Sequence, residues 1–446
     1  MNKQQEKIYS VKDIQEHQYL FKLSDEIGKG GQGIVFKTQY PDILIKLVNK
    51  AWSLNKQNSW LDKIHLLMTQ NLHGLNIAYP IALIEQPRAG YVMKLMDGLY
   101  PLSKLLEQFQ TDGTASYAPT GSLLRRLKIL AKLAHTLAEL HGRGLVYGDL
   151  SPHNIFISQN TEFSEVWLID CDNISALSRL SQQKIHTPDY GAPEIIREES
   201  GINSYTDSWS FAVITYQLLT GNHPLKGDLV INGDVELENK ALRGEIAWVN
   251  DSKDSSNHLS GDSLYDLVCD KYLKELFHRC FEAGLNHPAE RPSLSEWAEI
   301  LENTVFHTAF CEECKNTFIA KNQCPFCDTP QQAQSFILFT EYQFIPKSIL
   351  QKDFDLEIQD KDCWLKTEKT LILNKANSLN FRNFKIYLKD REIIFDNPHK
   401  QKFYLQQNKS VQKLPTQFFL SYQGKRKFIL HFGELGEVHL VWQFNW

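Results

Sequence analysis

The chain has 446 residues, of which 42% are hydrophobic and 23% charged, and its formal net charge at pH 7 is −5. This length is enough for two or three domains, and the composition is that of a soluble globular protein, which excludes disordered and fibrous classes. The polar first residues contain no apolar signal core and no apolar run reaches membrane-spanning length, so we expect a cytoplasmic protein without a membrane segment.

The first motif along the chain is a run of glycines, Gly28, Gly30 and Gly33, followed by Val35. Glycine lets the backbone come close to phosphates because no Cβ stands in the way. A dinucleotide-binding loop would need a helix directly after the glycines, whereas residues 34–48 have the pattern of β-rich hairpin strands. The pattern therefore predicts a glycine loop over the phosphates of ATP, with Val35 covering the adenine ring.

Lys46 lies inside the apolar strand predicted for residues 43–48. A buried ammonium needs an anionic partner, and the ATP phosphates together with a helix carboxylate would provide it. The chain has no Glu between Lys46 and Glu85, so we predict that Asp62, in a helix expected over residues 59–68, is that partner.

Residues 90–98 predict the last strand of a small β-rich lobe and the hinge that follows it. In this interpretation Met93 borders the adenine pocket, and the backbone of Lys94 and Met96 faces the edge of the base. Ordinary core packing explains the methionines equally well, and both interpretations can hold at once.

A helix is predicted from residue 122 onward by leucines at spacings of three and four, and it leads directly into a polar loop. That loop contains Asp149 and Asn154, and Asp170 follows an apolar strand. A carboxylate, a carboxamide and a second carboxylate in this order are what phosphoryl transfer from ATP needs. Asp149 would orient the attacking hydroxyl, while Asn154 and Asp170 would hold Mg²⁺ or Mn²⁺.

Further motifs follow in the matching order. Residues 187–194 resemble the end of a kinase activation segment, and residues 206–221 predict a helix buried on almost every side. Arg291 could pair with Glu194. Each motif is weak alone, but together they indicate a eukaryotic-like protein kinase.

Four cysteines, Cys311, Cys314, Cys324 and Cys327, form two C-x-x-C pairs nine residues apart. Such pairs can present four thiolates tetrahedrally to Zn²⁺, and with every position taken by Cys the metal would be structural. The alternatives are a redox pair or buried free thiols, but redox chemistry needs one C-x-x-C in a thioredoxin-like βαβ context, which this stretch lacks. We therefore predict a zinc ribbon over residues 305–330.

Residues 331–446 predict an all-β sandwich or barrel, because short alternating strands are separated by turn-rich links. The region holds 17 Lys and Arg against 12 Asp and Glu, a net charge of +5 that is too small to indicate nucleic-acid binding. It contains no catalytic constellation, so a binding or docking module is the better interpretation. The clearest predicted strands are 335–339, 384–388, 391–395, 417–420, 427–432 and 437–442.

Residues 21–330 resemble a group of bacterial Hanks-type protein kinases, those of the TerY-phosphatase-kinase triad and the related YegI-like kinases. The resemblance implies a bilobal α+β kinase fold over residues 21–304, with a small lobe over 21–96 and a large lobe over 97–304. It also implies a serine/threonine kinase of a bacterial signalling or stress system, with protein substrates, a PP2C-type phosphatase partner and a von Willebrand factor A protein. The residues that carry it are 147–150, 169–172, 192–194, 221–224, 291–297 and the cysteines.

Three positions depart from the kinase pattern. Gly148 replaces the usual Arg before the catalytic Asp, so phosphorylation of Thr187 would lack a basic clamp and is not expected to be the main switch. Asp172 stands where the third residue of the magnesium motif is normally Gly. Ser151 occupies the position where serine/threonine kinases usually have Lys, which weakens the prediction of a Ser or Thr substrate.

Two other functions remain open. In a pseudokinase scaffold the β module and ribbon would supply the function, but Lys46, Asp149, Asn154 and Asp170 are all retained. A small-molecule phosphotransferase of the aminoglycoside type shares the style of the catalytic loop, yet it would lack the Ala-Pro-Glu segment and Arg291.

Overall fold

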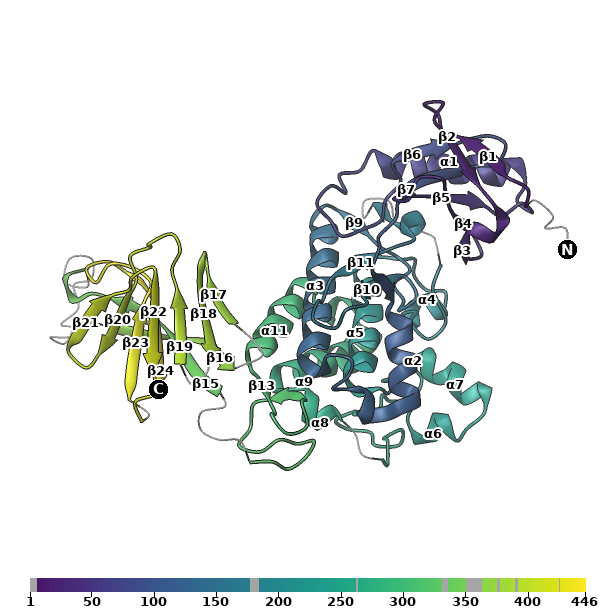
Figure 1. Cartoon of the computed structure of the whole chain (residues 1–446). Helices are drawn as coiled ribbons and strands as arrows, with labels where there is room; N and C mark the ends of the chain where they lie inside the picture. The colour runs from purple at the N-terminus through teal and green to yellow at the C-terminus, as the bar shows by residue number, and fades with distance from the viewer. Residues whose placement is uncertain are drawn as a thin grey trace, which may run out of the picture. The chain divides into compact units, whose positions relative to one another are not determined.

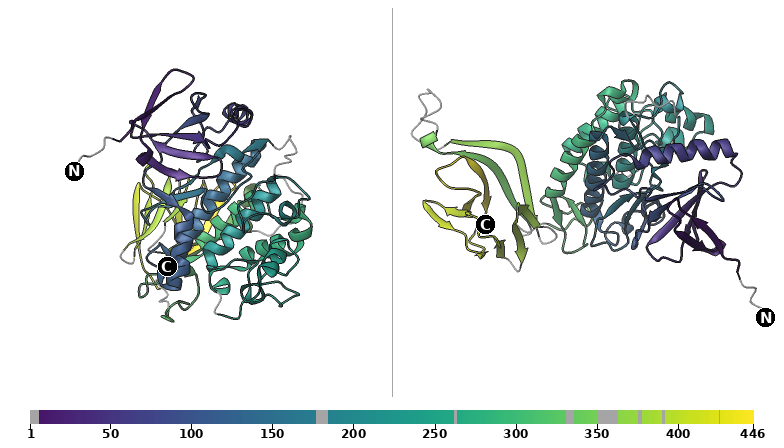
Figure 2. Two further views of the ribbon diagram at one scale, coloured as in Figure 1. Left: turned by 90° about the vertical axis from the view of Figure 1, so that its right-hand side faces the viewer. Right: turned by 90° about the horizontal axis from the view of Figure 1, so that it is seen from above.

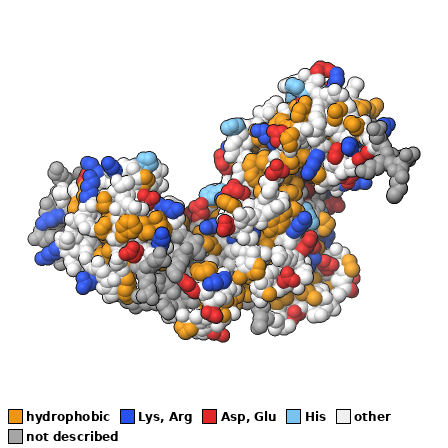
Figure 3. Space-filling view, in the orientation of Figure 1, with side chains coloured by type: hydrophobic (Ala, Val, Ile, Leu, Met, Phe, Trp, Pro, Cys, Tyr) orange, Lys and Arg blue, Asp and Glu red, His pale blue; other side chains and the backbone are white. Residues whose placement is uncertain are grey.

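The computed structural model of the protein describes residues 6–176, 184–261, 264–330, 336–349, 363–374, 378–389, 392–424 and 426–446. Two compact units are formed (Figure 1). The first spans Met1–Thr114, Ile129–Ser263 and Lys274–Ala298, and the second spans Ala115–Lys128, Leu264–Leu273 and Glu299–Trp446. Acidic and basic side chains are interspersed on the face of the first unit that Figure 3 shows. In the described part of the chain, no helix combines the length and the apolar character that a membrane span needs.

The first unit begins with a small lobe, an antiparallel sheet with strand order β3-β4-β5-β7-β6 against which helix α1 packs (Figure 2). The central strand β5 consists of aliphatic residues around Lys46 and is buried along most of its length. Trp60 and Ile64 lie one helical turn apart on α1 and join the core with Leu44 and Val48. The elements are β3 (Glu26–Lys29), β4 (Gly33–Lys37), β5 (Ile43–Val48), α1 (Leu54–Met68), β6 (Ala82–Ile84) and β7 (Gly90–Lys94).

A hairpin of β1 (Tyr9–Lys12) and β2 (Gln18–Phe21) precedes this sheet. Val11, Tyr19 and Phe21 pack in one core cluster with Phe36 and Ile45 of the sheet. The small lobe therefore begins before residue 21, where the sequence predicts it to start. The alternation of apolar and polar residues in each short strand is the signal for it.

After the turn at Gly98 the chain becomes mainly helical. In α5, every residue from Thr206 to Tyr216 is buried, as predicted for this helix. The helix ends at Gly221, whose φ of 79° is in the left-handed region that favours glycine. The helices are α2 (Leu102–Asp112), α3 (Ser122–Gly142), α4 (Pro193–Ile196), α5 (Ser204–Thr220), α6 (Asp228–Ile231), α7 (Val235–Leu242), α8 (Tyr265–Val268), α9 (Lys271–His278), α10 (Gly284–Asn286) and α11 (Leu294–Phe306).

Short strands and turns shape the loops between these helices. β10 pairs on one side with β11 and on the other with β8, and β12 pairs with β9. Their bounds are β8 (Leu99–Pro101), β9 (Leu145–Val146), β10 (Ile155–Ser158), β11 (Val166–Leu168) and β12 (Ser175–Ala176); the single turns are η1 (Leu23–Asp25), η2 (Gly113–Ser116), η3 (Cys171–Asn173), η4 (Arg279–Ala283) and η5 (Pro288–Glu290).

In the second unit the cysteine segment forms a small ribbon in which β13 (Thr308–Phe310) pairs with β14 (Thr317–Ile319). Ser122, at the start of α3, accepts a hydrogen bond of 2.7 Å at its Oγ from Thr317 N. Thr317 Oγ1 in turn accepts a bond of 2.7 Å from Leu124 N. The ribbon is therefore anchored to the first turn of α3.

From residue 336 onward the described part of the second unit is built mainly from strands, as predicted. One sheet has the order β16-β15-β24-β23-β20-β21 and the other β17-β18-β19-β22. They form a sandwich, because Phe339 and Phe444 of the first sheet share a core cluster with Phe384 and Phe395 of the second. The strands are β15 (Phe336–Ile345), β16 (Cys363–Asn374), β17 (Ser378–Phe381), β18 (Phe384–Lys389), β19 (Glu392–Asp396), β20 (Tyr404–Gln407), β21 (Ser410–Lys413), β22 (Gln417–Ser421), β23 (Lys427–His431) and β24 (His439–Asn445). The first residues of the predicted strands 335–339 and 391–395 lie outside the described residues.

Candidate active site

The glycine-rich turn joins β3 to β4. Space beside Gly28 and Gly30 is open, since a Cβ on either would meet no heavy atom within 4 Å. A Cβ on Gly33, in contrast, would clash with the carbonyl oxygen of Leu47 in β5, so the close approach of two strands requires glycine there. Val35 is half-buried in β4, next to the turn. The arrangement is suited to a loop that lies over phosphates.

Lys46 is buried in the middle of β5, and its ammonium contacts two carboxylates. Its Nζ lies 2.5 Å from Oδ1 of Asp170 and 2.7 Å from Oδ2 of Asp172. Burial by itself would lower the pKa of Lys46, but the negative charges of Asp172 and Asp170 outweigh burial and raise the pKa. Lys46 is therefore charged, and it connects the sheet of the small lobe to the loop after β11.

The predicted pairing of Asp62 with Lys46 is wrong. Helix α1 turns Trp60 and Ile64 toward the sheet, whereas Asp62 is exposed. The further carboxylate on Lys46 belongs to Asp172, and Trp60 Nε1 donates to Oδ2 of the same residue over 3.2 Å. The sequence feature that could have identified this partner of Lys46 was Asp172 itself, an acid at a position where kinases normally have glycine.

The three residues predicted to border the adenine ring lie at the end of β7 and directly after it. Met93 is buried and packs in one core cluster with Leu44 and Tyr91, so the core-packing interpretation holds for it. Lys94 is exposed and Met96 is half-buried. Their contacts with a base stay a prediction.

Asp207, to which no sequence motif pointed, fixes the backbone of the loop that contains Asp149. Its Oδ2 accepts a hydrogen bond of 2.7 Å from Tyr147 N, and its Oδ1 accepts one of 2.8 Å from Gly148 N. His141 Nε2 lies 2.9 Å from Oδ2 as well. Asp207 is the charged residue of helix α5, which the sequence predicts to be buried on almost every side. That was the signal that could have identified it, because a buried charge needs partners.

The backbone conformation that Asp207 holds explains why residue 148 is a glycine. Its φ is 86°, and a Cβ would clash with the side chain of Ile202. The residue before Asp149 is therefore held in a conformation that favours glycine.

Asp149 receives a hydrogen bond of 2.8 Å at Oδ1 from the hydroxyl of Thr187. Burial raises the pKa of Asp149, and the charge of Asp170 raises it further, while the bond from Thr187 lowers it. The net shift is upward, as suits a group that takes a proton from an alcohol.

A main-chain hydrogen bond joins the segments of Asn154 and Asp170, and a side-chain bond fixes Asn154 in its loop. Ile169 N donates to Asn154 O over 2.9 Å, and Asn154 Nδ2 donates to the main-chain oxygen of Asp149 over 3.0 Å. Asp170 has a φ of 56°, an uncommon value for a residue other than glycine. Carboxylate and amide oxygens are the donors that Mg²⁺ prefers, so this pair fits the ion.

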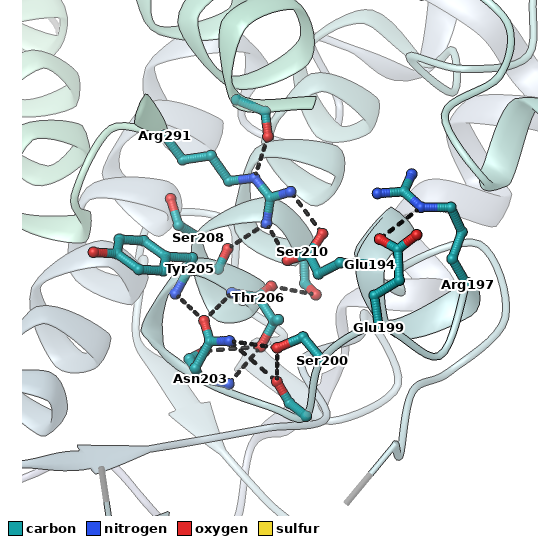
Figure 4. Close-up of polar contacts among 12 residues, drawn as sticks. Glu194, Arg197, Glu199, Ser200, Asn203, Tyr205, Thr206, Ser208, Ser210 and Arg291 are labelled. Carbon is teal, nitrogen blue, oxygen red and sulfur yellow. Dashed lines mark hydrogen bonds and ion pairs between the residues drawn. The ribbon is translucent and has the colours of Figure 1, made fainter. Parts of the chain in front are cut away.

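The predicted ion pair between Glu194 and Arg291 is confirmed (Figure 4). Nη1 and Nη2 of Arg291 each donate a bond of 2.8 Å to one carboxylate oxygen of Glu194. Nε donates to Gly284 O over 2.8 Å, and the guanidinium lies 4.8 Å from the ring centroid of Trp209. Both charged groups are buried, so the pair ties α4 to the loop before α11.

The four cysteines of the ribbon come together. All four Sγ atoms lie within 4.8 Å of one another, with Cys311 and Cys327 at 3.6 Å and Cys314 and Cys324 also at 3.6 Å. A tetrahedral site with Zn–S bonds of about 2.3 Å has S···S distances of about 3.8 Å. The geometry and the all-thiol donor set therefore fit a zinc ion.

Comparison with known proteins places this site in a family. The sequence profile of the protein kinase domain family matches residues 21–306. Myosin light chain kinase A of Dictyostelium discoideum is 29% identical over 222 residues, which cover 48% of this chain and 71% of that protein. Serine/threonine-protein kinase D3 of Homo sapiens is 29% identical over 221 residues, and serine/threonine-protein kinase dkf-2 of Caenorhabditis briggsae is 25% identical over 239 residues; the matches cover 24% and 19% of those proteins. The chain belongs to the protein kinase family, and two of these three relatives are named serine/threonine-protein kinases.

Proposed function

We propose that the protein transfers the γ-phosphate of ATP to Ser and Thr hydroxyls of protein substrates. The observation that carries this proposal is the contact of 2.5 Å between Lys46 Nζ and Asp170 Oδ1. It joins a lysine of the β-sheet to the loop of the candidate metal ligands, at the place where a triphosphate would have to bind.

Each side chain has a defined task in this proposal. Lys46 binds the α- and β-phosphates, and Asn154 and Asp170 hold the metal. Asp149 orients the substrate hydroxyl and accepts its proton at the carboxylate. Bound Mg²⁺ would neutralise charge on the phosphate oxygens.

Two observations favour this function over its alternatives. A pseudokinase scaffold has no need for a buried, charged Lys46 held at the metal-binding Asp170. A small-molecule phosphotransferase would lack the segment that ends at Glu194 and the buried Arg291 that fixes it.

The test is incubation of the full chain with γ-labelled ATP, Mg²⁺, and casein and histone as acceptors, followed by phosphoamino-acid analysis. We expect label on Ser and Thr with the wild type and background label with Asp149→Asn. Equal labelling by both proteins, or label on neither acceptor and none on the chain itself, would contradict the proposal.

We further propose that the four cysteines bind one structural Zn²⁺. The support is the clustering of four thiols in a ribbon whose own core is small, with Ala309 and Phe318 as its fully buried apolar residues. A segment of this size needs the folding free energy that a metal supplies.

We also propose that the protein acts in a bacterial signalling system with a PP2C-type phosphatase and a von Willebrand factor A protein, and that residues 331–446 are a docking module. The support is the resemblance carried by residues 147–150 and 169–172 and by the cysteine segment. Removal of phosphate from the labelled chain by a phosphatase of this type, and not by one of another family, is the expected result.

A further inference from the structure

Asp172, in the loop after β11, is the centre of a buried polar cluster that includes three side chains of the small lobe. Its side chain has no exposed surface and accepts hydrogen bonds from three different elements. Lys46 Nζ of β5 donates over 2.7 Å, Tyr91 Oη of β7 over 2.9 Å and Trp60 Nε1 of α1 over 3.2 Å. Because all three donors converge on one carboxylate, its position is fixed more tightly than that of a surface acid.

The two acids on Lys46 differ in their surroundings. Asp172 is fully enclosed, whereas the side chain of Asp170 is 34% exposed. Only Asp170 can therefore turn toward a ligand that enters from solvent.

The charges around this cluster are rearranged relative to the kinase pattern. That pattern has a helix carboxylate for the strand lysine. In α1 the half-buried Lys63 instead lies in the field of the negative charges of Asp172 and Asp170. Burial lowers the pKa of Lys63, and both aspartates act against that change. Helix α1 thus supplies a cation, and the loop after β11 supplies the carboxylate.

We propose that Asp172 is the positioning residue that holds Lys46 in place for the nucleotide phosphates, in the role that other kinases give to a helix glutamate. Asp170 releases Lys46 when it takes up the metal, and Asp172 does not. The proposal deepens the proposed function and rests on it. It makes the orientation of Lys46 independent of an acid on α1. That helix instead contributes the indole N–H of Trp60, which donates to Asp172.

The experiment compares full-length variants in two readouts, the affinity for Mg²⁺·ATP by calorimetry and the steady-state values of kcat and KM for ATP. Asp172→Asn keeps the shape of the side chain and removes the charge, so we expect kcat/KM for ATP to fall about tenfold or more. Asp172→Gly restores the usual residue of the family and should show the same loss. The matched control is Asp62→Asn, an exposed acid of α1, which should keep wild-type values.

A rescue separates positioning from mere structural support. In Asp172→Gly/Lys63→Glu the acid returns to the helix, and we expect affinity and kcat/KM to recover part of the loss. Trp60→Phe, which removes one donor without changing charge, should raise KM for ATP by a smaller factor and serves as the test if Asp172 variants do not fold. The proposal would be overturned if Asp172→Gly folds and keeps the wild-type kcat/KM and affinity. If the Asp172 variants do not fold, an unchanged KM for ATP in Trp60→Phe would overturn it. If the wild type transfers no phosphate, the proposed function fails, and the affinity measurements still decide whether Asp172 positions Lys46.

Discussion

The hydroxyl of Thr187 donates a hydrogen bond of 2.8 Å to Oδ1 of Asp149. This contact spans 38 residues of sequence and holds the activation segment against the catalytic loop. Gly148, next to Asp149, contributes no side chain, so no guanidinium stands there to bind a phosphate. A phosphate on Thr187 would instead place negative charge directly beside a carboxylate. We infer that the unmodified hydroxyl of Thr187 supports the active arrangement.

The activity of Thr187 variants should depend on whether the hydrogen bond to Asp149 is kept. Thr187→Ser keeps the hydroxyl and should retain most activity, while Thr187→Val should lower kcat about tenfold, because it removes one bond to a charged group. Thr187→Glu, which mimics the charge of a phosphate, should be at least as impaired as Thr187→Val. The measurement is the initial rate of transfer to casein. A Thr187→Glu protein more active than the wild type would show that phosphorylation is the switch.

The pH dependence should report the surroundings of Asp149. The carboxylate must be deprotonated to accept a proton. The value of kcat/KM is therefore highest above the pKa of Asp149 and decreases as the pH falls through that pKa. Burial raises that pKa and the bond from Thr187 lowers it. Thr187→Val should therefore move the acid limb of the profile to higher pH. The exposed Thr111→Val is the control and should leave the profile in place, and an acid limb that stays or moves lower in Thr187→Val would contradict the assignment.

The sequence could predict that the loop of Asp149 and Asn154 lies beside Asp170, because this information is local. Asp149 and Asn154 are separated by a fixed spacing, and Asp170 follows a strand that is apolar in the sequence. The pair of Glu194 and Arg291 was found as well, since each belongs to a recognisable motif. Contacts of this kind need only the order of motifs along the chain.

The partner of Lys46 could not be predicted in the same way. It depends on which face α1 turns inward, and the bulky Trp60 and Ile64 decide that against Asp62. Asp172 is 126 residues from Lys46, and no local pattern connects the two. The hairpin before residue 21 was missed for a related reason, because its few apolar residues have meaning only when packed on the sheet.

The buried ion pair of Arg291 and Glu194 should contribute much more to the free energy of unfolding than the nearby pair of Arg197 and the exposed Glu199. Arg291→Met leaves a carboxylate buried without its partner, so we expect a loss of about 3–5 kcal/mol in the free energy of unfolding. Glu199→Gln breaks the nearby pair with Arg197, in which Glu199 is exposed, and should cost at most about 1 kcal/mol (Figure 4). Urea denaturation followed by tryptophan fluorescence compares the two. Equal losses in both variants would show that the buried pair does not hold this region.

The zinc content of the protein should depend on the four cysteines of the ribbon, whereas its affinity for ATP should not. The full chain purified without chelator is expected to contain close to one equivalent of zinc by elemental analysis. The double variant Cys324→Ser/Cys327→Ser should lose it, because two of the four thiolates are gone, while its affinity for ATP stays at the wild-type value. Cys363→Ser, a thiol of β16 outside the cluster, should keep the metal. Wild-type protein without zinc and with all four ribbon thiols reactive would rule the site out.

The most direct test of the account is the rate of γ-phosphate transfer by Asp149→Asn, measured beside its affinity for Mg²⁺·ATP. Asp149 is assigned to the substrate hydroxyl and not to the nucleotide, so affinity should stay at the wild-type value. The rate should fall by about 10²–10⁴, the usual contribution of a general base. Asp170→Ala should instead lose both transfer and metal-dependent nucleotide binding. Transfer by Asp149→Asn at the wild-type rate would contradict the central claim that this loop carries out phosphoryl transfer.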